Sequence, residues 1–366
     1  MKIIHLIKGS EWGGVARYVL DFCAAMDSSG HEVTLLSGAT DSIDDNFRFC
    51  GLHVAKAPLK KFGDWRSLSV LSKTIDRGEP SIIHVHGFLD AFPAVIARLL
   101  FGCRRTAIVV TRHIVKPGSH SLFNRWIYGS VDKVVFVSQL AMDTFLSSNP
   151  PIDRGKLSVV HNSIKVDTAV KRVEPEPTSD GLPLKLLFVG RVCRDKGIEV
   201  LLDALKLLKD ERLTLDVVGT GDDSYVEQLK QMAEDNGISG RVHWLGFHED
   251  VHQFIESADV VVCPSIVREA CPLSVLECMA HEKAVIASDN GGQAEFVASG
   301  RNGVLVPSGD PEGLAEVIRG LIASLELRQR LGRNALSDFR ETLSYPVFIA
   351  KMQKIYEDVL MERCLP

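Results

Sequence analysis

Short apolar runs alternate with amphipathic segments along nearly the whole chain. The runs are rich in consecutive Val, Ile and Leu, a pattern typical of parallel strands that are covered on both faces. In the first half, strands are expected at residues 2–8, 32–37, 81–86, 107–111, 133–138 and 157–161. In the second half, they are expected at residues 185–189, 213–218, 242–245, 259–263, 284–287 and 304–306. Helical segments lie between them, so the pattern predicts an α/β fold with parallel, doubly wound sheets.

A polar break divides this pattern into two halves. Residues 166–183 hold three prolines and show no periodicity, so we interpret them as an interdomain linker. The prediction is two Rossmann-like domains, at residues 1–167 and 184–344. Residues 345–366 are predicted to form an amphipathic helix that returns to pack on the first domain.

Composition narrows the class of protein. The chain has 366 residues, of which 45% are hydrophobic and 24% charged, as expected for a soluble protein of about two domains. A net charge of −5 argues against a nucleic-acid binder. Basic residues do cluster in the first half, and two interpretations stay open, namely a solvated surface or contact with an anionic membrane or charged acceptor. They are Lys56, Lys60, Lys61 and Arg66, then Arg104, Arg105, Arg112, Lys116 and Arg125.

The cysteines and the N-terminal residues favour a cytoplasmic protein. The eight cysteines are scattered, without a Cys-x-x-Cys pair or a histidine at zinc spacing. Met1 and Lys2 lead directly into the first predicted strand, which is unlike an export signal. No apolar run reaches membrane-spanning length.

Ligands of such domains bind at the carboxyl ends of the strands, so the strand-to-helix loops carry the candidate chemistry. The loop at residues 8–14 is glycine-rich, but Gly-x-Gly-x-x-Gly is absent, which argues against a dinucleotide. In the loop at residues 190–197, Arg191 and Lys196 are five residues apart and can converge on a phosphate at a helix start, with a solvated charged loop as the alternative. Gly219 ends the next strand and permits close backbone approach to a ligand.

Two glutamates flank a predicted helix start at residues 263–280. Glu269 and Glu277 are eight residues apart, and Pro272 between them suits the first turn of a helix. One carboxylate is expected at the mouth of the helix, with the other about two turns along it. Such a pair can bind sugar and ribose hydroxyls, although chance alone supplies about one pair at this spacing.

Histidines mark two strand ends in the first half. We expect His84 and His86 to point to opposite faces of their strand, with one of them in the core. His86 precedes Gly87 at the strand end, where binding is more plausible. His113 is expected to face the cleft, where it could bind a sugar hydroxyl or the acceptor, and a structural role stays equally open.

These motifs occur together in the order of one known family. They are Gly13-Gly14, GR-x4-KG at residues 190–197, PS-x3-E-x7-E at residues 264–277, NGG-x2-E from Asn290, and NG-x-LV at residues 302–306. Over nearly its whole length the chain resembles a retaining glycosyltransferase of family 4 with the GT-B fold, in which two Rossmann-like domains face each other. It departs from that pattern at Asn162-Ser163 and at residues 270–272, where the family commonly has Asn-Gly and a Gly-Phe-Gly-like run.

The resemblance implies a nucleotide-sugar donor held mainly by the second domain, with UDP as the favoured nucleotide and GDP as the alternative. Arg191 and Lys196 would bind the diphosphate, Glu277 the ribose and Glu269 the sugar. The remaining donor contacts would come from Gly13, Gly14, Gly219, backbone around Phe247, and the amides of Leu273 and Ser274. The expected catalytic residues are Glu269, His113, Arg191 and Lys196. On the acceptor side we expect Trp12, His86, Arg112 and Asn162.

The departing diphosphate needs compensating positive charge. Many transferases use a metal held by Asp-x-Asp, which this chain lacks, so we predict a metal-independent enzyme without a cofactor. Retention of anomeric configuration follows from the resemblance only. The resemblance also implies the transfer of a hexose or N-acetylhexosamine to a saccharide or lipid-linked acceptor in cell-surface polysaccharide or lipopolysaccharide biosynthesis.

Other functions stay open at this point. A nucleotide-sugar 2-epimerase would share the fold, and a non-catalytic nucleotide-sugar sensor would share the binding residues. The segment at residues 116–126 (KPGSHSLFNRW) mixes basic and apolar residues. It is either an ordinary helix start over the core or a peripheral contact with the inner face of the cytoplasmic membrane.

Overall fold

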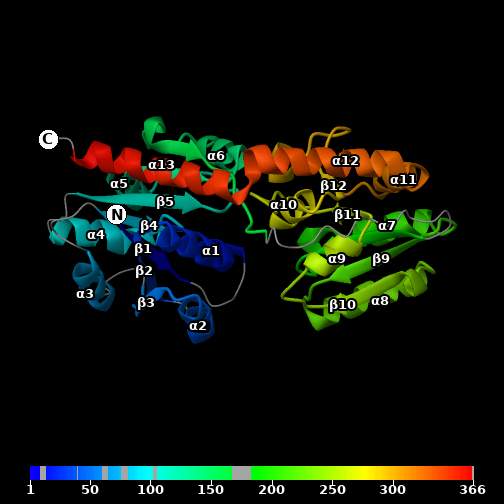
Figure 1. The fold of residues 1–366 in the computed structure, drawn as a ribbon, viewed down its shortest axis with the longest axis horizontal. Helices are drawn as coiled ribbons and strands as arrows, with labels where there is room; N and C mark the ends of the chain where they lie inside the picture. The colour runs from blue at the N-terminus through cyan, green and yellow to red at the C-terminus, as the bar shows by residue number, and fades with distance from the viewer. Residues whose placement is uncertain are drawn as a thin grey trace. The chain divides into compact units, whose positions relative to one another are not determined.

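The protein is described by a computed structural model for residues 1–8, 14–38, 40–59, 65–75, 81–101, 105–166 and 183–364. The chain divides into two compact units (Figure 1). Unit 1 contains Met1–Asn162 and Tyr345–Pro366, and unit 2 contains Ser163–Ser344. Most of the predicted linker, residues 167–182, lies outside the described residues.

Unit 1 is built on a seven-stranded parallel sheet with the order β3-β2-β1-β4-β5-β6-β7. The strands are β1 (Lys2–Ile7), β2 (Glu32–Ser37), β3 (His53–Lys56), β4 (Ser81–Val85), β5 (Thr106–Arg112), β6 (Lys133–Phe136) and β7 (Leu157–Val159). Its helices are α1 (Gly14–Ser28), α2 (Asp41–Phe49), α3 (Trp65–Thr74), α4 (Ala91–Leu100), α5 (Leu122–Ser130), α6 (Gln139–Leu146) and α13 (Tyr345–Cys364). The central strands are apolar throughout because helices cover both faces of the sheet.

Unit 2 repeats this plan with a six-stranded parallel sheet in the order β10-β9-β8-β11-β12-β13. The strands are β8 (Leu184–Val189), β9 (Leu213–Val218), β10 (Val242–Gly246), β11 (Val260–Cys263), β12 (Ala284–Ser288) and β13 (Val304–Val306). Its helices are α7 (Ile198–Leu207), α8 (Asp223–Asp235), α9 (His252–Ser257), α10 (Leu273–Ala280), α11 (Pro311–Ala323) and α12 (Leu325–Asp338). A π-helical turn at Phe339–Leu343 follows α12.

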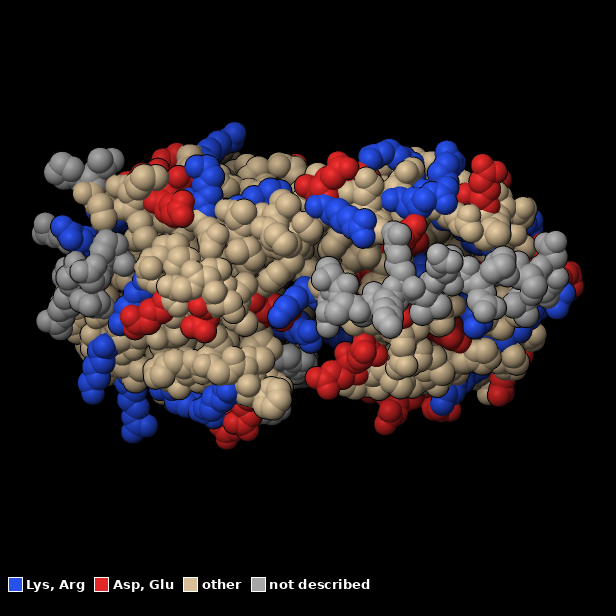
Figure 2. Space-filling view, in the orientation of Figure 1, with Lys and Arg blue, Asp and Glu red and all other residues tan. Residues whose placement is uncertain are grey.

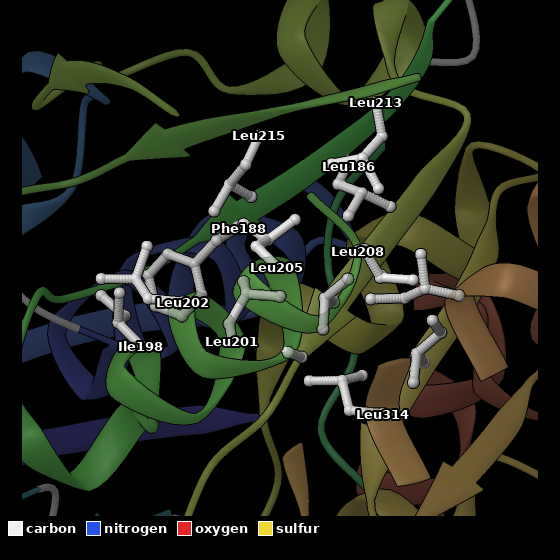
Figure 3. Close-up of a cluster of buried hydrophobic side chains, with 14 of the residues drawn as sticks. Leu186, Phe188, Ile198, Leu201, Leu202, Leu205, Leu208, Leu213, Leu215 and Leu314 are labelled. Carbon is white, nitrogen blue, oxygen red and sulfur yellow. The ribbon is translucent and has the colours of Figure 1, made fainter. Parts of the chain in front are cut away.

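In the core of unit 2, one face of a strand with a two-residue period packs on the buried stripe of a helix. Leu186 and Phe188 are two residues apart in β8, so they share one face of the sheet (Figure 3). They pack on the buried stripe of α7, whose residues recur every three or four positions: Ile198, Leu201, Leu202 and Leu205. Each such side chain contributes roughly 1.5–3 kcal/mol by burial. This packing places the loop before α7 at the carboxyl edge of the sheet.

The last helix belongs to unit 1 although the chain reaches it through unit 2. In Figure 1, α13 runs along the sheet of unit 1, where it contacts β4 and β5. Its buried stripe joins the core of that unit: Phe348, Met352, Ile355, Tyr356 and Val359. Two parallel-sheet units with a returning C-terminal helix confirm the predicted fold class. Strand β3 was not predicted, because its two end residues, His53 and Lys56, are polar and exposed and the two between them are only half-buried.

Charged residues of both signs are interspersed on the visible face of each unit (Figure 2), in keeping with the modest net charge. Within the described residues, no helix is both long and apolar enough to span a membrane.

Candidate donor and acceptor sites

The strand-to-helix loops of unit 2 pack backbone against backbone. A side chain added at Gly219 would place its Cβ 1.9 Å from the carbonyl oxygen of Gly190, and at Gly197 2.1 Å from that of Pro264. At Gly292 it would lie 2.0 Å from the carbonyl oxygen of Ala270. These separations are far below van der Waals contact, so only glycine fits there. The loops after β8, β9, β11 and β12 therefore form one interlocked platform at the carboxyl edge of the sheet.

Hydrogen bonds join the same loops. The amide of Gly190 donates to the carbonyl of Val218 at 3.0 Å. The amide of Ile266 donates to the carbonyl of Asp195 at 2.9 Å, and the amide of Gly292 to that of Glu269 at 2.7 Å. Because three separate loops are tied in this way, the side chains they carry have defined positions.

A three-residue polar cluster stands on this platform. The ammonium of Lys196 lies 2.5 Å from Oε2 of Glu269, and Ser265 donates its hydroxyl to Oε1 of the same carboxylate. About a fifth of each of the two charged side chains is exposed (21% for Lys196 and 19% for Glu269). The structure thus brings together two residues that are 73 positions apart in the chain. A half-buried ion pair at a strand end can open to bind a ligand. An anionic group of the ligand can replace the carboxylate on the lysine, and a hydroxyl group can replace the ammonium on the glutamate.

Helix α10 begins beside this cluster. It starts at Leu273, and no side chain caps its first amides. Pro272 is the residue before the helix, with extended backbone, so its predicted place in the first turn is wrong by one position. Ser274 lies with its hydroxyl 3.7 Å from the Cys263 thiol. Glu277 is half-buried one turn further along the helix.

Both glutamates affect the pKa of the Cys263 thiol. Burial raises its pKa to about 11, and the carboxylates of Glu269 and Glu277 add to that rise, while Ser274 and Lys196 oppose it. Both carboxylates therefore act electrostatically on one buried thiol at the end of β11.

The other predicted donor residues of unit 2 follow strands of the same sheet. Arg191 is exposed immediately after β8, in the loop that leads to Lys196. Gly219 follows β9 with a φ of 140°, a conformation that L-residues rarely adopt. Phe247 follows β10, and its ring is 68% exposed. Gly14 is the first residue of α1 in unit 1. Gly13 and Trp12 lie outside the described residues.

The acceptor-side predictions fall in unit 1. His86 and His113 follow β4 and β5, and Nδ1 of His86 lies 3.3 Å from Nε2 of His113. The rings of His84 and His86 have centroids 4.7 Å apart, so the expectation of opposite faces is wrong. Residues two apart in a strand share a face.

Arg112 and Asn162 are both buried in the protein. The Arg112 guanidinium lies over the rings of Phe88 and Phe145, at 5.6 and 5.1 Å, and donates to the Lys116 carbonyl at 2.7 Å. Burial lowers its pKa from the ordinary value. Asn162 is buried at the end of unit 1. Their acceptor roles stay predictions, and the contacts of Arg112 give it a structural role as well.

Family models match almost the whole chain. The model for glycosyl transferases group 1 matches residues 171–338, and the model for glycosyltransferase family 4 matches residues 12–168. EpsD of Bacillus subtilis is 36% identical over 283 residues, which are 72% of this chain and 73% of that protein. The chain belongs to the family 4/group 1 glycosyltransferases.

Two further likenesses bear on this glycosyltransferase. The lipopolysaccharide core biosynthesis glycosyltransferase LpsE of Rhizobium meliloti is 32% identical over 163 residues, 44% of this chain and 46% of LpsE. Anabaena Alr3699/HepE, solved in complex with UDP, superposes with a TM-score of 0.84 at 19% identity. That superposition covers 98% of this chain and all of HepE, and it shows a shared GT-B fold.

Several residues that contact the two candidate sites were not predicted from the sequence. In unit 2, Ser265 was visible as part of the PS motif, but its bond to Glu269 was not predicted. In unit 1, His5 and Tyr356 carried no signal, because a lone histidine in an apolar strand and a tyrosine on an amphipathic helix are ordinary core residues.

Proposed function

We propose that this glycosyltransferase moves a hexose or N-acetylhexosamine from a nucleotide-diphosphate sugar, with UDP as the favoured nucleotide, to a saccharide or lipid-linked acceptor. The observation that carries the proposal is the cluster of Lys196, Glu269 and Ser265 on the glycine platform, beside the uncapped start of α10. Cation, carboxylate and free amides are the groups that a sugar diphosphate needs.

Each group has a role in the proposal. Lys196 and Arg191 bind the diphosphate, and the first amides of α10, at Leu273 and Ser274, add partial positive charge. When the donor enters, Lys196 exchanges the Glu269 carboxylate for phosphate. Glu269 then accepts hydrogen bonds from the sugar hydroxyls and remains oriented by Ser265.

The rest of the donor lies along the same edge in this scheme. Glu277 binds the ribose hydroxyls, and the backbone at Phe247 and Gly219 approaches the base and the phosphates. Gly14 and His113 come from unit 1, with His113 beside the transferring sugar. The likeness to the UDP-bound HepE fold supports a UDP donor.

We further propose that transfer is metal-independent and proceeds with retention of anomeric configuration. Charge develops on the departing diphosphate, and preorganised cations stabilise it most effectively in a site from which water is excluded. Lys196 and Arg191 supply that charge. The proposed route is attack from the face that the nucleotide leaves, with the leaving phosphate as the base.

The acceptor and the location belong to the same proposal. Cell-surface polysaccharide or lipopolysaccharide biosynthesis would place the enzyme in the cytoplasm, in peripheral contact with the inner face of the cytoplasmic membrane. The name of LpsE supports a role in lipopolysaccharide biosynthesis. Exposed apolar side chains at the start and middle of α5, Leu122 (85%) and Trp126 (36%), offer a surface for such contact.

The decisive test compares two cations of one loop. Lys196→Met is expected to lower the rate of nucleotide release from a UDP-hexose donor by about 100- to 1,000-fold, because transition-state charge loses its partner. Arg194→Met is the matched control. Arg194 lies two residues away and contacts the Tyr225 ring and Glu199 instead, so this variant is expected to retain activity within about threefold.

The outcomes separate the candidate functions. Equal activity of Lys196→Met and wild type in the presence of a working acceptor would contradict the proposal. Epimerised free nucleotide sugar formed without any acceptor would indicate an epimerase. Donor binding without transfer across a panel of saccharide and lipid-linked acceptors would indicate a sensor.

A further inference from the structure

Four histidine rings gather in unit 1 at the carboxyl side of three neighbouring strands. His5 comes from β1, His84 from β4, and His86 and His113 from the positions just after β4 and β5. His5 and His84 are fully buried, and the other two are half-buried. Ring centroids lie 4.8 Å apart for His5 and His84 and 5.5 Å apart for His86 and His113. Such a concentration in a core requires that the imidazoles satisfy one another.

His84 is saturated by its neighbours. Its Nδ1 lies 2.6 Å from the hydroxyl of Tyr356 in α13, and its Nε2 lies 2.7 Å from the hydroxyl of Thr111 in β5. Both nitrogens therefore have short hydrogen bonds to hydroxyl groups, which can donate or accept as required.

This saturation decides between two uses of the cluster. His5, His84 and His86 each bring one nitrogen within 4.8 Å of the others, a spacing at which three histidines can hold a metal ion. A metal would need a lone pair of His84, and both of its nitrogens are already engaged at hydrogen-bond distance. The geometry therefore favours imidazoles that bond to hydroxyls and to each other.

The other three histidines form a chain. Nδ1 of His5 lies 3.3 Å from Nε2 of His86, and Nδ1 of His86 lies 3.3 Å from Nε2 of His113. A neutral imidazole carries one donor and one acceptor, so all the protons along the chain point the same way. Burial keeps the rings neutral, and it lowers the pKa of His5 to about 3 and that of His113 to about 4.

The surroundings of His5, at one end of this row of histidines, determine the direction in which the ring protons point. Nε2 of His5 is buried and has no hydrogen-bond partner among the described residues. If the histidines donated their protons toward His5, Nε2 of His5 would carry a buried N–H without an acceptor, which folded proteins rarely tolerate. If they donate toward His113, the same nitrogen of His5 holds only a lone pair.

We propose that His86, itself held by His5, is a positioning residue that fixes His113 with its proton on Nδ1. His5 donates from Nδ1 to Nε2 of His86, and His86 donates from Nδ1 to Nε2 of His113. The ring of Tyr18 packs edge-on against His113, with centroids 4.9 Å apart, and restrains its plane. His113 therefore offers a hydrogen-bond donor rather than a base. The use of that donor by a sugar hydroxyl rests on the proposed function, whereas the tautomer does not.

The test is a nitrogen NMR measurement on the whole chain labelled with ¹⁵N-histidine at pH 7. Long-range proton–nitrogen correlations distinguish a protonated from a bare ring nitrogen, and the His113 signals are assigned by their loss in His113→Asn. We expect His113 to have a protonated Nδ1 and a bare Nε2. A wild-type spectrum with the proton on Nε2 overturns the proposal without any variant of His86.

Two variants of His86 isolate its contribution. His86→Leu removes the donor, so His113 is expected to lose its single tautomer, with a new population protonated at Nε2. His86→Asn places an amide N–H near the former Nδ1 position and is expected to keep the wild-type tautomer. An unchanged His113 spectrum in His86→Leu, or stoichiometric zinc binding that disappears in that variant, overturns the proposal. Because no donor substrate is present, this outcome is independent of the transfer assay.

Discussion

The two candidate sites of this glycosyltransferase are built from different materials. In unit 2, glycine loops lock backbone against backbone and carry an ion pair, Lys196–Glu269. In unit 1, neutral aromatic and imidazole rings pack together under a helix from the far end of the chain. The first site is rigid through close backbone approach, and the second through packed side chains. A substitution should therefore act through steric exclusion in unit 2 and through lost hydrogen bonds or burial in unit 1.

The largest effect is expected from Gly292→Ala in the platform of unit 2. The new Cβ would lie 2.0 Å from the carbonyl oxygen of Ala270, so a loop must move and lose its hydrogen bonds. We expect the free energy of unfolding to fall by about 3 kcal/mol or more. Gly240→Ala is the control, because its Cβ would meet nothing within 4 Å. Urea denaturation followed by circular dichroism measures both, and equal stabilities would refute the interlocked platform.

The next effect is a pH dependence of unit 1. Burial lowers the pKa of His5 to about 3, whereas the unfolded chain titrates near 6.5. Below about pH 6.5 the unfolded chain binds protons that the folded protein does not. Stability is therefore complete above that pH and falls toward pH 4, by about 1.4 kcal/mol per pH unit for each neutral histidine.

The variant His5→Leu tests this sign and size. Urea denaturation between pH 7 and pH 5 is expected to show a shallower loss of stability than in the wild type, by about one proton. The absolute stability of the variant does not enter, since only the slope is compared. Parallel curves for the two proteins would show that His5 titrates alike in the folded and unfolded chains.

A smaller effect is expected when α13 loses one hydroxyl. Tyr356→Phe leaves Nδ1 of His84 buried without its partner, which should lower the free energy of unfolding by about 1–2 kcal/mol. Tyr345→Phe, on the same helix, is the matched control. The Tyr345 hydroxyl is buried without a hydrogen-bond partner among the described residues, so its removal relieves an unpaired polar group and should leave stability unchanged or raise it by up to about 1 kcal/mol. Thermal unfolding of the pair in parallel checks the difference.

The smallest effect is expected at an exposed ring of unit 2. The Phe247 side chain is 68% exposed, and the proposed contact with the base uses backbone. Phe247→Ala should change stability by less than about 0.5 kcal/mol and UDP affinity by less than about threefold. Isothermal titration with UDP measures the affinity. A tenfold weakening would show that the ring itself binds the base, and that this site does not depend on backbone alone.

Much of the fold was predictable because its signals are local. Runs of Val, Ile and Leu indicated twelve of the strands to within a few residues, since a buried parallel strand must be apolar on both faces. The loop from Gly190 to Gly197 stood out for a related reason, because glycines and paired cations between a strand and a helix are a local pattern. Its role in binding a phosphate stays a prediction.

The histidine cluster could not be predicted. His84 and Tyr356 are 272 positions apart, and neither has a neighbour in sequence that reveals the other. His84 and His86 also lie on one face of their strand, although opposite faces were expected. Likewise, the bond from Ser265 to Glu269 depends on the path of the loop between them, which the motif alone does not specify.

By itself, the sequence determined two parallel-sheet units, the family, and the loops that carry the candidate donor residues, because strand periodicity, glycine and charge act over a few residues. Only the tertiary structure decided which side chains meet: Lys196 with Glu269, His86 with His113, and Tyr356 of the last helix with His84. Those contacts follow from the order of strands in each sheet and from the return of α13 to unit 1. Strand order depends on packing over the whole chain, and no local pattern encodes it.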